Sequence, residues 1–336
     1  MVHQTGSEVS TIIETKYERA LQWATQYLTS HLNLHIIHHQ KVVQTAYSIV
    51  HKVETNQGIF YLKQTPEALF FEATMLAFLH QQGCENIPEL LTENRALHCF
   101  IMPACGEDAL RQIFQGNIDL NQLASGISNY TKIQRSLENK VPALLSLGTP
   151  DWRLNQVAAL YDQLIQQNRL LIDDGLTDQE ITRLHQLYPT CIQLCEDLAK
   201  YRIPETINHC DFQANNMLLD KKTGAVNMID WGEVVIAHPF FSHNSCLWNL
   251  TYFNKLKQTD RLYGQIQSQC VTAWLDLHPE ETLLKAFKIA KQLNGIFAAL
   301  AYERIYLATK DQPKTLQEEH PGSIAGCLRT FLANVM

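Results

Sequence analysis

The sequence predicts an α+β fold of two lobes, with a small antiparallel sheet and one helix first and a larger, mainly helical lobe after it. Its 336 residues exceed the roughly 150 residues of one typical domain. Strand-like alternation dominates before residue 103, and helical periodicity dominates after Gly106. We therefore expect an N-terminal helix over 1–30, a sheet lobe over 31–103 and a helical lobe over 104–336.

The first lobe shows a regular order of expected elements. Apolar residues at helical spacing over 8–30 predict an amphipathic helix. Strands are expected at 34–39, 46–53 and 59–62, and the last two are joined by the turn Glu54–Gly58. Pro66 is expected to open a helix that runs to a stop at Gly83. Strand-like runs at 89–92 and 97–102 complete the lobe.

The second lobe is mainly helical with one hairpin. Thr177 and Glu180 form a capping-box pattern, and the apolar stripe of the helix that it opens continues to Leu198. The runs 217–219 and 226–229 flank a turn and predict a hairpin. The pattern over 283–307 is apolar nearly all round, which predicts a central helix.

Composition narrows the class of protein. A formal net charge of -7 gives no basic face, so we expect no nucleic-acid partner. Nine cysteines without C-x-x-C spacing are typical of reduced, mostly buried thiols. The N-terminus has no signal pattern, and no apolar run is long enough for a membrane span. These observations predict a soluble cytoplasmic protein without a membrane partner and leave its oligomeric state open.

The residues that carry chemistry lie in the second lobe. His209, Asp211 and Asn216 stand in one loop before the expected hairpin, and Asp230 follows nineteen residues after Asp211. Phosphoryl transfer needs one carboxylate for the proton of the attacking hydroxyl, and oxygen ligands that hold Mg²⁺ against the phosphates. Because the hairpin returns the chain, Asp211, Asn216 and Asp230 can face one cleft. A turn-capping role for the same residues is the structural alternative.

The spacing His209-x-Asp211-x-x-x-x-Asn216, followed by Ile229-Asp230-Trp231, resembles the aminoglycoside phosphotransferase and choline kinase-like family of the protein-kinase-like fold. The resemblance implies a kinase that uses ATP and Mg²⁺ to phosphorylate a hydroxyl group of a small molecule. It implies that Asp211 is the catalytic base and that Asn216 and Asp230 are the metal ligands. His209 is expected to be structural, with ring nitrogens that hydrogen-bond loop backbone.

Lys63 and Glu72 supply the expected phosphate-binding cation. Lys63 ends an apolar strand, and Glu72 lies on a mostly apolar helix, where a bare carboxylate is costly. An ion pair between Lys63 and Glu72 would explain both the lysine at the strand end and the carboxylate on the apolar helix. It would also match the lysine–glutamate pair of the family that the sequence resembles. Two independent surface charges are the alternative.

Other nucleotide contacts are expected on backbone atoms. The Pro103 carbonyl and the Cys105 N–H are candidates for the adenine ring, although an ordinary strand end explains this segment equally well. The phosphate-covering loop falls at 40–48 and holds no glycine, so Gln44 and Thr45 are expected to take its place. Ser242 stands where the family has an aspartate that braces the catalytic loop.

The acceptor remains open from sequence. Aromatic residues after the catalytic loop, together with Glu303, could bind an ammonium-bearing substrate by cation–π contact; they could equally be helical core. The candidates are Trp248, Tyr252, Trp274, Tyr302 and Glu303. Aminoglycoside, choline-like, amino-sugar and nucleoside acceptors all fit.

Two other functions compete with the small-molecule kinase. The glycine-free loop favours a catalytically weak or inactive nucleotide-binding pseudokinase or scaffold. The presence of every expected polar site residue disfavours it: Lys63, Glu72, Asp211, Asn216 and Asp230. A metal hydrolase that uses His209, Asp211 and Asp230 lacks a second well-spaced histidine ligand.

Overall fold

The computed structural model describes residues 5–312 and 314–335, and of residues 5–16 it describes the backbone alone. The chain divides into two compact units. The sheet unit holds residues up to Gly83, Ile87–Cys105 and Arg304–Pro321; the helical unit holds Cys84–Asn86, Gly106–Glu303 and the residues from Gly322 on. The sequence did not predict that Cys84–Asn86 belongs to the helical unit or that Arg304–Pro321 belongs to the sheet unit.

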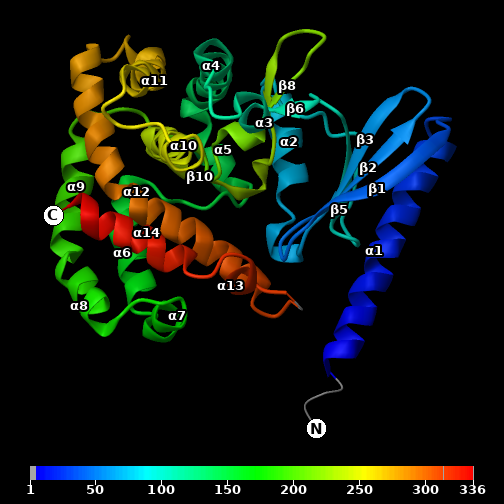
Figure 1. Ribbon diagram of the computed structural model, residues 1–336, viewed down its shortest axis with the longest axis horizontal. Coiled ribbons are helices and arrows are strands. Elements are labelled where there is room, and N and C mark those ends of the chain that lie inside the picture. The colour runs from blue at the N-terminus through cyan, green and yellow to red at the C-terminus, as the bar shows by residue number, and fades with distance from the viewer. Residues whose placement is uncertain (1–4, 313, 336) are drawn as a thin grey trace. The chain divides into compact units, whose positions relative to one another are not determined.

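The sheet unit is built on a five-stranded antiparallel sheet in the order β1-β2-β3-β5-β4. Figure 1 labels four of these strands, β1, β2, β3 and β5. The elements of the unit are α1 (Thr5–Ser30), β1 (Ile36–Gln44), β2 (Ile49–Thr55), β3 (Gly58–Gln64), α2 (Glu72–Gln81), β4 (Thr92–Asn94), β5 (Cys99–Pro103) and α13 (Leu316–Glu319). The turn between β2 and β3 is tight because Thr55 pairs with Gly58. The strands expected at 34–62 are therefore present, with bounds shifted by a few residues.

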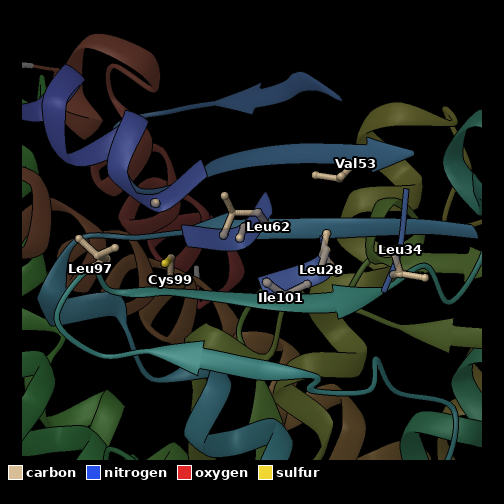
Figure 2. Packing of buried hydrophobic residues seen from close by; sticks show 9 residues of the cluster. Leu28, Leu34, Val53, Leu62, Leu97, Cys99 and Ile101 are labelled. Atoms are coloured by element: carbon tan, nitrogen blue, oxygen red, sulfur yellow. The ribbon is translucent and has the colours of Figure 1, made fainter. Parts of the chain in front are cut away.

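Helix α1 packs along the sheet through small and branched apolar side chains. Ala20, Ala24 and Leu28 are buried in one cluster with Leu62 of β3 and Ile101 of β5. Figure 2 labels Leu28, Leu62 and Ile101 of this cluster. Burial of a leucine side chain contributes about 1.5–3 kcal/mol, so this seam holds the helix on the sheet. The outer positions expected for the same helix, Val9 to Ile13, lie among side chains outside the described residues.

Two expectations about elements of the sheet unit are wrong. A helix does not start at Pro66: a short 3-10 turn spans Glu67–Leu69, and α2 begins only at Glu72. Phe70 has ψ 61°, which breaks the helical path between them. Residues 89–91 are not a strand, and β4 starts at Thr92. The break after Leu69 places Glu72 in the first turn of α2.

The helical unit carries two small sheets, β6-β8-β9 and β10-β7. Its strands are β6 (Asp108–Ala109), β7 (Thr206–His209), β8 (Met217–Leu219), β9 (Val226–Met228) and β10 (Val234–Ala237). Its helices are α3 (Leu110–Phe114), α4 (Leu120–Ser136), α5 (Val141–Ser146), α6 (Leu154–Ile165), α7 (Asn168–Asp173), α8 (Asp178–Gln186), α9 (Tyr188–Ala199), α10 (Phe240–Phe253), α11 (Arg261–Val271), α12 (Glu280–Thr309, up to Glu303) and α14 (Ser323–Asn334).

The expected capping box and hairpin are confirmed. Thr177 accepts from the Glu180 N–H, and Glu180 reaches back to Thr177. The hairpin pairs Met217 with Met228. The stripe from Ile181 to Leu198 is not one helix, however, because the chain turns at Leu187 and α9 starts anew with Pro189 in its first turn.

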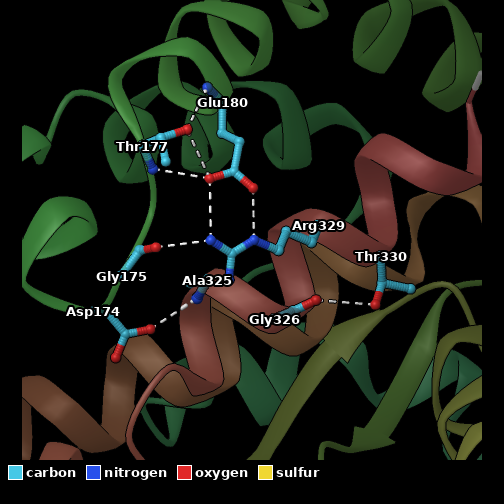
Figure 3. A network of polar contacts seen from close by, with 8 residues as sticks. All are labelled: Asp174, Gly175, Thr177, Glu180, Ala325, Gly326, Arg329 and Thr330. Atoms are coloured by element: carbon cyan, nitrogen blue, oxygen red, sulfur yellow. Dashed lines mark hydrogen bonds and ion pairs between the residues drawn. The ribbon is translucent and has the colours of Figure 1, made fainter.

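Helices α12 and α14 pack at close range in the helical unit. A Cβ on Gly295 would lie 2.6 Å from backbone atoms of Cys327 and Phe331, so glycine is required there. Helix α14 is also held at its start and middle (Figure 3): Asp174 accepts from the Ala325 N–H, and Arg329 pairs with Glu180. No helix among residues 5–312 and 314–335 is long and apolar enough to cross a membrane.

Candidate active site

The loop after β7 is organised by the imidazole of His209. Its Nδ1 accepts the Asp211 N–H at 3.1 Å, and its Nε2 donates to the Ile229 carbonyl at 2.9 Å. An N–H can only donate and a carbonyl can only accept, so the ring is neutral with its proton on Nε2. The imidazole thereby links the loop to the residue before Asp230. Since both nitrogens bond backbone, His209 is not placed to bind a metal.

The Asp211 carboxylate is held by two side-chain amides. Gln213 Nε2 donates to Oδ1, and Asn216 Nδ2 donates to Oδ2 at 2.7 Å and to the Asp211 carbonyl at 2.9 Å. Asp211 itself is half-buried. Each carboxylate oxygen keeps a further lone pair that can accept a hydroxyl proton. Gln213 was not singled out in the sequence, where it occupies a variable position of the motif.

Asn216 and Asp230 fit the chemistry of a magnesium ligand pair. Asn216 is 5% exposed, and since its Nδ2 points at Asp211, its Oδ1 accepts no hydrogen bond from any described residue. Asp230 is half-buried and left-handed, with φ 69° and ψ 54°. A non-glycine residue in this region stores strain, which functional loops often carry. Amide and carboxylate oxygens are the ligands that Mg²⁺ prefers.

The metal-hydrolase alternative has no support in this geometry. Within the described ranges, no three His, Cys, Asp or Glu side chains form a group that could hold a metal ion. His209 and Asp211 are instead occupied by the backbone and amide hydrogen bonds given above.

Lys63 and Glu72 form the ion pair expected from the sequence. Lys63 Nζ lies 2.5 Å from Glu72 Oε2. The two residues are 7% and 1% exposed, so the pair is shielded from solvent. Because Glu72 is the first residue of α2, its carboxylate also lies at the positive end of the helix dipole. The lysine is therefore held by a rigid partner from the next element.

The glycine-free turn between β1 and β2 is closed by Thr45. Its N–H donates to the Ser48 carbonyl at 2.8 Å, and its hydroxyl oxygen accepts from the N–H groups of Tyr47 and Ser48. No residue from 44 to 49 has a positive φ, so the turn needs no glycine. These three N–H groups are used inside the turn. Tyr47 Oη also lies 3.5 Å from His320 Nε2.

The expected adenine contacts lie where β5 ends. Pro103 pairs with Phe60, and the Ala104 N–H donates to the Ile59 carbonyl at 2.9 Å. Cys105 is thus the first residue past the paired part of the sheet, and it is half-exposed. The adenine contacts at Pro103 and Cys105 stay a prediction.

The aromatic acceptor candidates separate into two groups. Trp248 and Tyr252 are 47% and 56% exposed on α10, and their rings stack at 5.3 Å. Trp274 is 0% exposed and packs edge-on against Phe240, so it is core and the interpretation as a substrate contact is wrong.

Glu303, another acceptor candidate, is half-buried on α12. It accepts a hydrogen bond from Gln167 Nε2, and burial raises the pKa of its carboxyl group, with that bond opposing the shift. Tyr302 is half-buried beside it in the chain.

Arg111 links the exposed aromatic residues to the catalytic loop. Its guanidinium lies 3.8 Å from the centre of the Phe253 ring. Burial lowers the pKa of Arg111, and the charge of Asp211 opposes that shift, so the two groups lie within electrostatic reach. Helix α3, which carries Arg111, packs against the turn Ala214–Asn216. No sequence pattern pointed to this arginine.

The comparison with protein families decides the class. The model of the phosphotransferase enzyme family, APH, matches residues 50–268. The chain belongs to this family. The resemblance inferred from the His209–Trp231 motif is therefore confirmed, and this family member is an enzyme of the phosphotransferase type. No curated protein matches its sequence.

Solved structures confirm the kinase-like fold of this APH-family chain. A GDP complex of an aminoglycoside 2'-phosphotransferase is 15% identical, with a TM-score of 0.60, over 94% of this chain and 97% of that one. A macrolide 2'-phosphotransferase type I is 12% identical with a TM-score of 0.57, over 92% and 96%. Plasmodium vivax ethanolamine kinase is 14% identical with a TM-score of 0.55, over 89% and 82%. At these identities the likeness concerns the fold.

Proposed function

We propose that this protein transfers the γ-phosphoryl group of ATP, with Mg²⁺, to a hydroxyl group of a small molecule. The observation that carries the proposal is the state of Asp211: a half-buried carboxylate held by two neutral amides, in a loop tied by His209 to the residue before Asp230. Among the described residues, the Asp211 carboxylate forms no ion pair with a basic side chain. Its oxygens therefore keep lone pairs that can accept the hydrogen bond of an acceptor hydroxyl.

In this proposal Asp211 orients the hydroxyl and accepts its proton as the oxygen attacks phosphorus. Little further covalent help is needed, because phosphoryl transfer depends mostly on positioning and on charge stabilisation. Gln213 and Asn216 hold the carboxylate in one orientation. His209 supports the loop through backbone hydrogen bonds and takes no proton from the substrate.

Asn216 Oδ1 and the Asp230 carboxylate would hold Mg²⁺. When bound, the metal supplies charge neutralisation and fixes the phosphate oxygens. This chain's own contribution is to aim the two oxygens: Asn216 through its bonds to Asp211, and Asp230 through its left-handed backbone.

Lys63 is proposed to neutralise phosphate charge, with Glu72 holding its ammonium group in place. Gln44 and Thr45 are proposed to cover the phosphates. Because Thr45 uses the N–H groups of Tyr47 and Ser48 within the turn, this cover contributes fewer backbone donors than a glycine-rich loop. Adenine is proposed to bind the Pro103 carbonyl and the Cys105 N–H.

The acceptor is proposed to bind on the exposed face of α10, at Trp248 and Tyr252. The charged neighbours of this aromatic group are cations: Lys255 lies 5.3 Å from the centre of the Tyr252 ring, and Arg111 covers Phe253. A second cation over the same rings would be repelled. Of the acceptors left open by the sequence, a flat, uncharged hydroxyl compound such as a nucleoside therefore fits better than an aminoglycoside or a choline-like cation. Tyr302 and Glu303 are kept as further candidates.

The test is a screen of hydroxylated metabolites and antibiotics for stimulated ATP consumption with Mg²⁺. Asp211→Ala should abolish turnover while ATP binding stays largely intact, and Asp230→Ala should remove the magnesium dependence of ATP binding. Trp248→Ala should raise KM for the acceptor more than it changes kcat. Turnover that survives in the Asp211 variant would overturn the proposal, and nucleotide binding without any Asp211-dependent turnover would favour the scaffold alternative.

A further inference from the structure

A buried hydrogen-bond network that runs through the hydroxyl groups of Tyr130 and Ser242 supports the backbone of the catalytic loop. The His209 N–H donates to Tyr130 Oη at 2.8 Å, and Tyr130 Oη donates to Ser242 Oγ at 2.8 Å. Ser242 Oγ in turn donates to Asn208 Oδ1 at 2.7 Å. All four residues are 0% exposed. Each of these donors has one acceptor, so the hydroxyl protons have a single consistent direction.

Both ends of this hydrogen-bond network are bonded to backbone carbonyls of neighbouring strands. Asn208 Nδ2 donates to the Ala237 carbonyl of β10 at 2.9 Å. At the other end, Gln134 Nε2 donates to Tyr130 Oη at 3.3 Å and to the Ile207 carbonyl at 3.1 Å. A buried polar network rigidifies its surroundings when its members are satisfied, as these are. The strand β7, which leads into the loop, is thus fixed on both sides.

The Tyr130 ring also contacts the residues around the two proposed catalytic carboxylates. It stacks on Phe212, the residue after Asp211, with ring centres 4.1 Å apart and planes at 26°. It lies 6.2 Å from the ring of Trp231, the residue after Asp230. One side chain of α4 therefore touches both neighbours of the Asp211 segment, His209 and Phe212, and a neighbour of Asp230.

We propose that Tyr130, with Ser242 as its hydrogen-bond acceptor, is the positioning residue that holds Asp211 for phosphoryl transfer. This rests on the proposed function. The tyrosine–serine pair reaches the loop through the His209 N–H and reaches the strand before it through Asn208. Because the pair carries no charge, it holds the loop without placing a second negative charge behind Asp211. Burial raises the pKa of Tyr130, which keeps the hydroxyl protonated.

Tyr130→Phe tests this inference, and Tyr161→Phe is its matched control. Tyr161 is equally buried in the same unit, and its hydroxyl donates to the Leu184 carbonyl at 2.8 Å, without any contact to the catalytic loop. Tyr161→Phe loses one buried hydrogen bond, whereas Tyr130→Phe removes the donor to Ser242 and the acceptor of the His209 N–H and of Gln134 Nε2. The control therefore separates the loss of a buried tyrosine hydroxyl from the loss of its contact with the catalytic loop.

Two readouts separate positioning from stability. In MgATP turnover, measured as phosphate release with water as acceptor, Tyr130→Phe should lower kcat about tenfold and leave KM for ATP within about twofold. In hydrogen exchange, backbone amides of residues 207–213 should exchange about tenfold faster. Tyr161→Phe should change neither quantity.

Should Tyr130→Phe fail to fold, Ser242→Ala removes the acceptor of the same hydroxyl and should give the same two changes in weaker form. Equal kcat and equal exchange in the Tyr130 and Tyr161 variants would overturn the inference and leave the proposed function standing. Turnover that is independent of Asp211 would instead overturn the proposed function, and the inference with it, whatever the exchange data show for the loop.

Discussion

In the sheet unit, Lys63 and Glu72 meet as one buried ion pair, whereas in the helical unit Asp211 is held by the amides of Gln213 and Asn216. In the ion pair, the Glu72 carboxylate at the start of α2 holds the Lys63 ammonium group in place. The second arrangement fixes an anion with neutral hydrogen-bond donors, and among the described residues its carboxylate forms no ion pair. The difference corresponds to the proposed roles, because a phosphate-binding lysine needs only its position, whereas a base must stay able to accept a proton.

Removal of one partner from the ion pair should have the largest effect on stability. Lys63→Met leaves the buried Glu72 without its 2.5 Å partner and should lower the free energy of unfolding by about 3–5 kcal/mol. Urea unfolding measures this. The double variant Lys63→Met/Glu72→Leu should recover much of the loss, since no isolated charge remains.

The control for that prediction is the pair Lys52–Glu54 on β2, with side chains 24% and 36% exposed. Lys52→Met should lower the free energy of unfolding far less than Lys63→Met does, because solvent screens an exposed pair. Equal losses for the Lys63 and Lys52 variants would show that burial of the pair does not matter, and the contrast between the two units would fail.

Acid should weaken the helical unit through its neutral histidines. Burial lowers the pKa of His238 and His243 to about 3. The unfolded chain, with a pKa of 6.5, takes up these protons first, so stability is full above pH 6.5 and is lost as the pH falls toward 3. At pH 5 each histidine should cost ~2 kcal/mol relative to neutral pH.

Unfolding of wild type and His238→Asn between pH 8 and pH 5 measures this cost. The variant should lose ~2 kcal/mol less than wild type over that interval. Identical slopes for the two proteins would mean that His238 titrates alike in the folded and unfolded chains.

The smallest effect is expected at the clamp on α14 (Figure 3). The hydrogen bonds from Arg329 are the main reason that the pKa of Glu180 is lowered to about 2. The pair therefore stabilises the fold above pH 4.5, and this stabilisation is lost as the pH falls toward 2. The Arg329 side chain is 46% exposed, which weakens the pair. Arg329→Gln should cost about 1 kcal/mol, and 1 M salt should reduce the difference between the variant and wild type. A loss unaffected by salt would point to packing.

Much of the proposed site could be predicted because it depends on local patterns. The spacing from His209 to Asn216 specifies a loop, and the hairpin that follows returns the chain to Asp230. The partnership of Lys63 with Glu72 followed from the cost of an unpaired buried charge. The break that sets the start of α2 was missed, since Pro66 is compatible with a helix start and nothing in the sequence marks the turn at Phe70.

The support behind the site could not be predicted. Tyr130 lies 79 residues before its partner His209 and 112 before Ser242, within an ordinary amphipathic helix. Periodicity shows that such a residue is buried but not what its hydroxyl bonds. The same limit applies to Arg111, and to Trp274, whose type alone does not tell a core aromatic from an exposed one.

The most direct test of the account is the loss of one negative charge at Asp211. Asp211→Asn keeps the shape of the side chain and should lower kcat for phosphoryl transfer about 10²–10⁴-fold, with the Kd for MgATP within about twofold of wild type. Asp220→Asn, on the turn of the following hairpin where the carboxylate binds Thr223, should leave both values unchanged. Equal kcat in wild type and Asp211→Asn would contradict the assignment of Asp211 as the base.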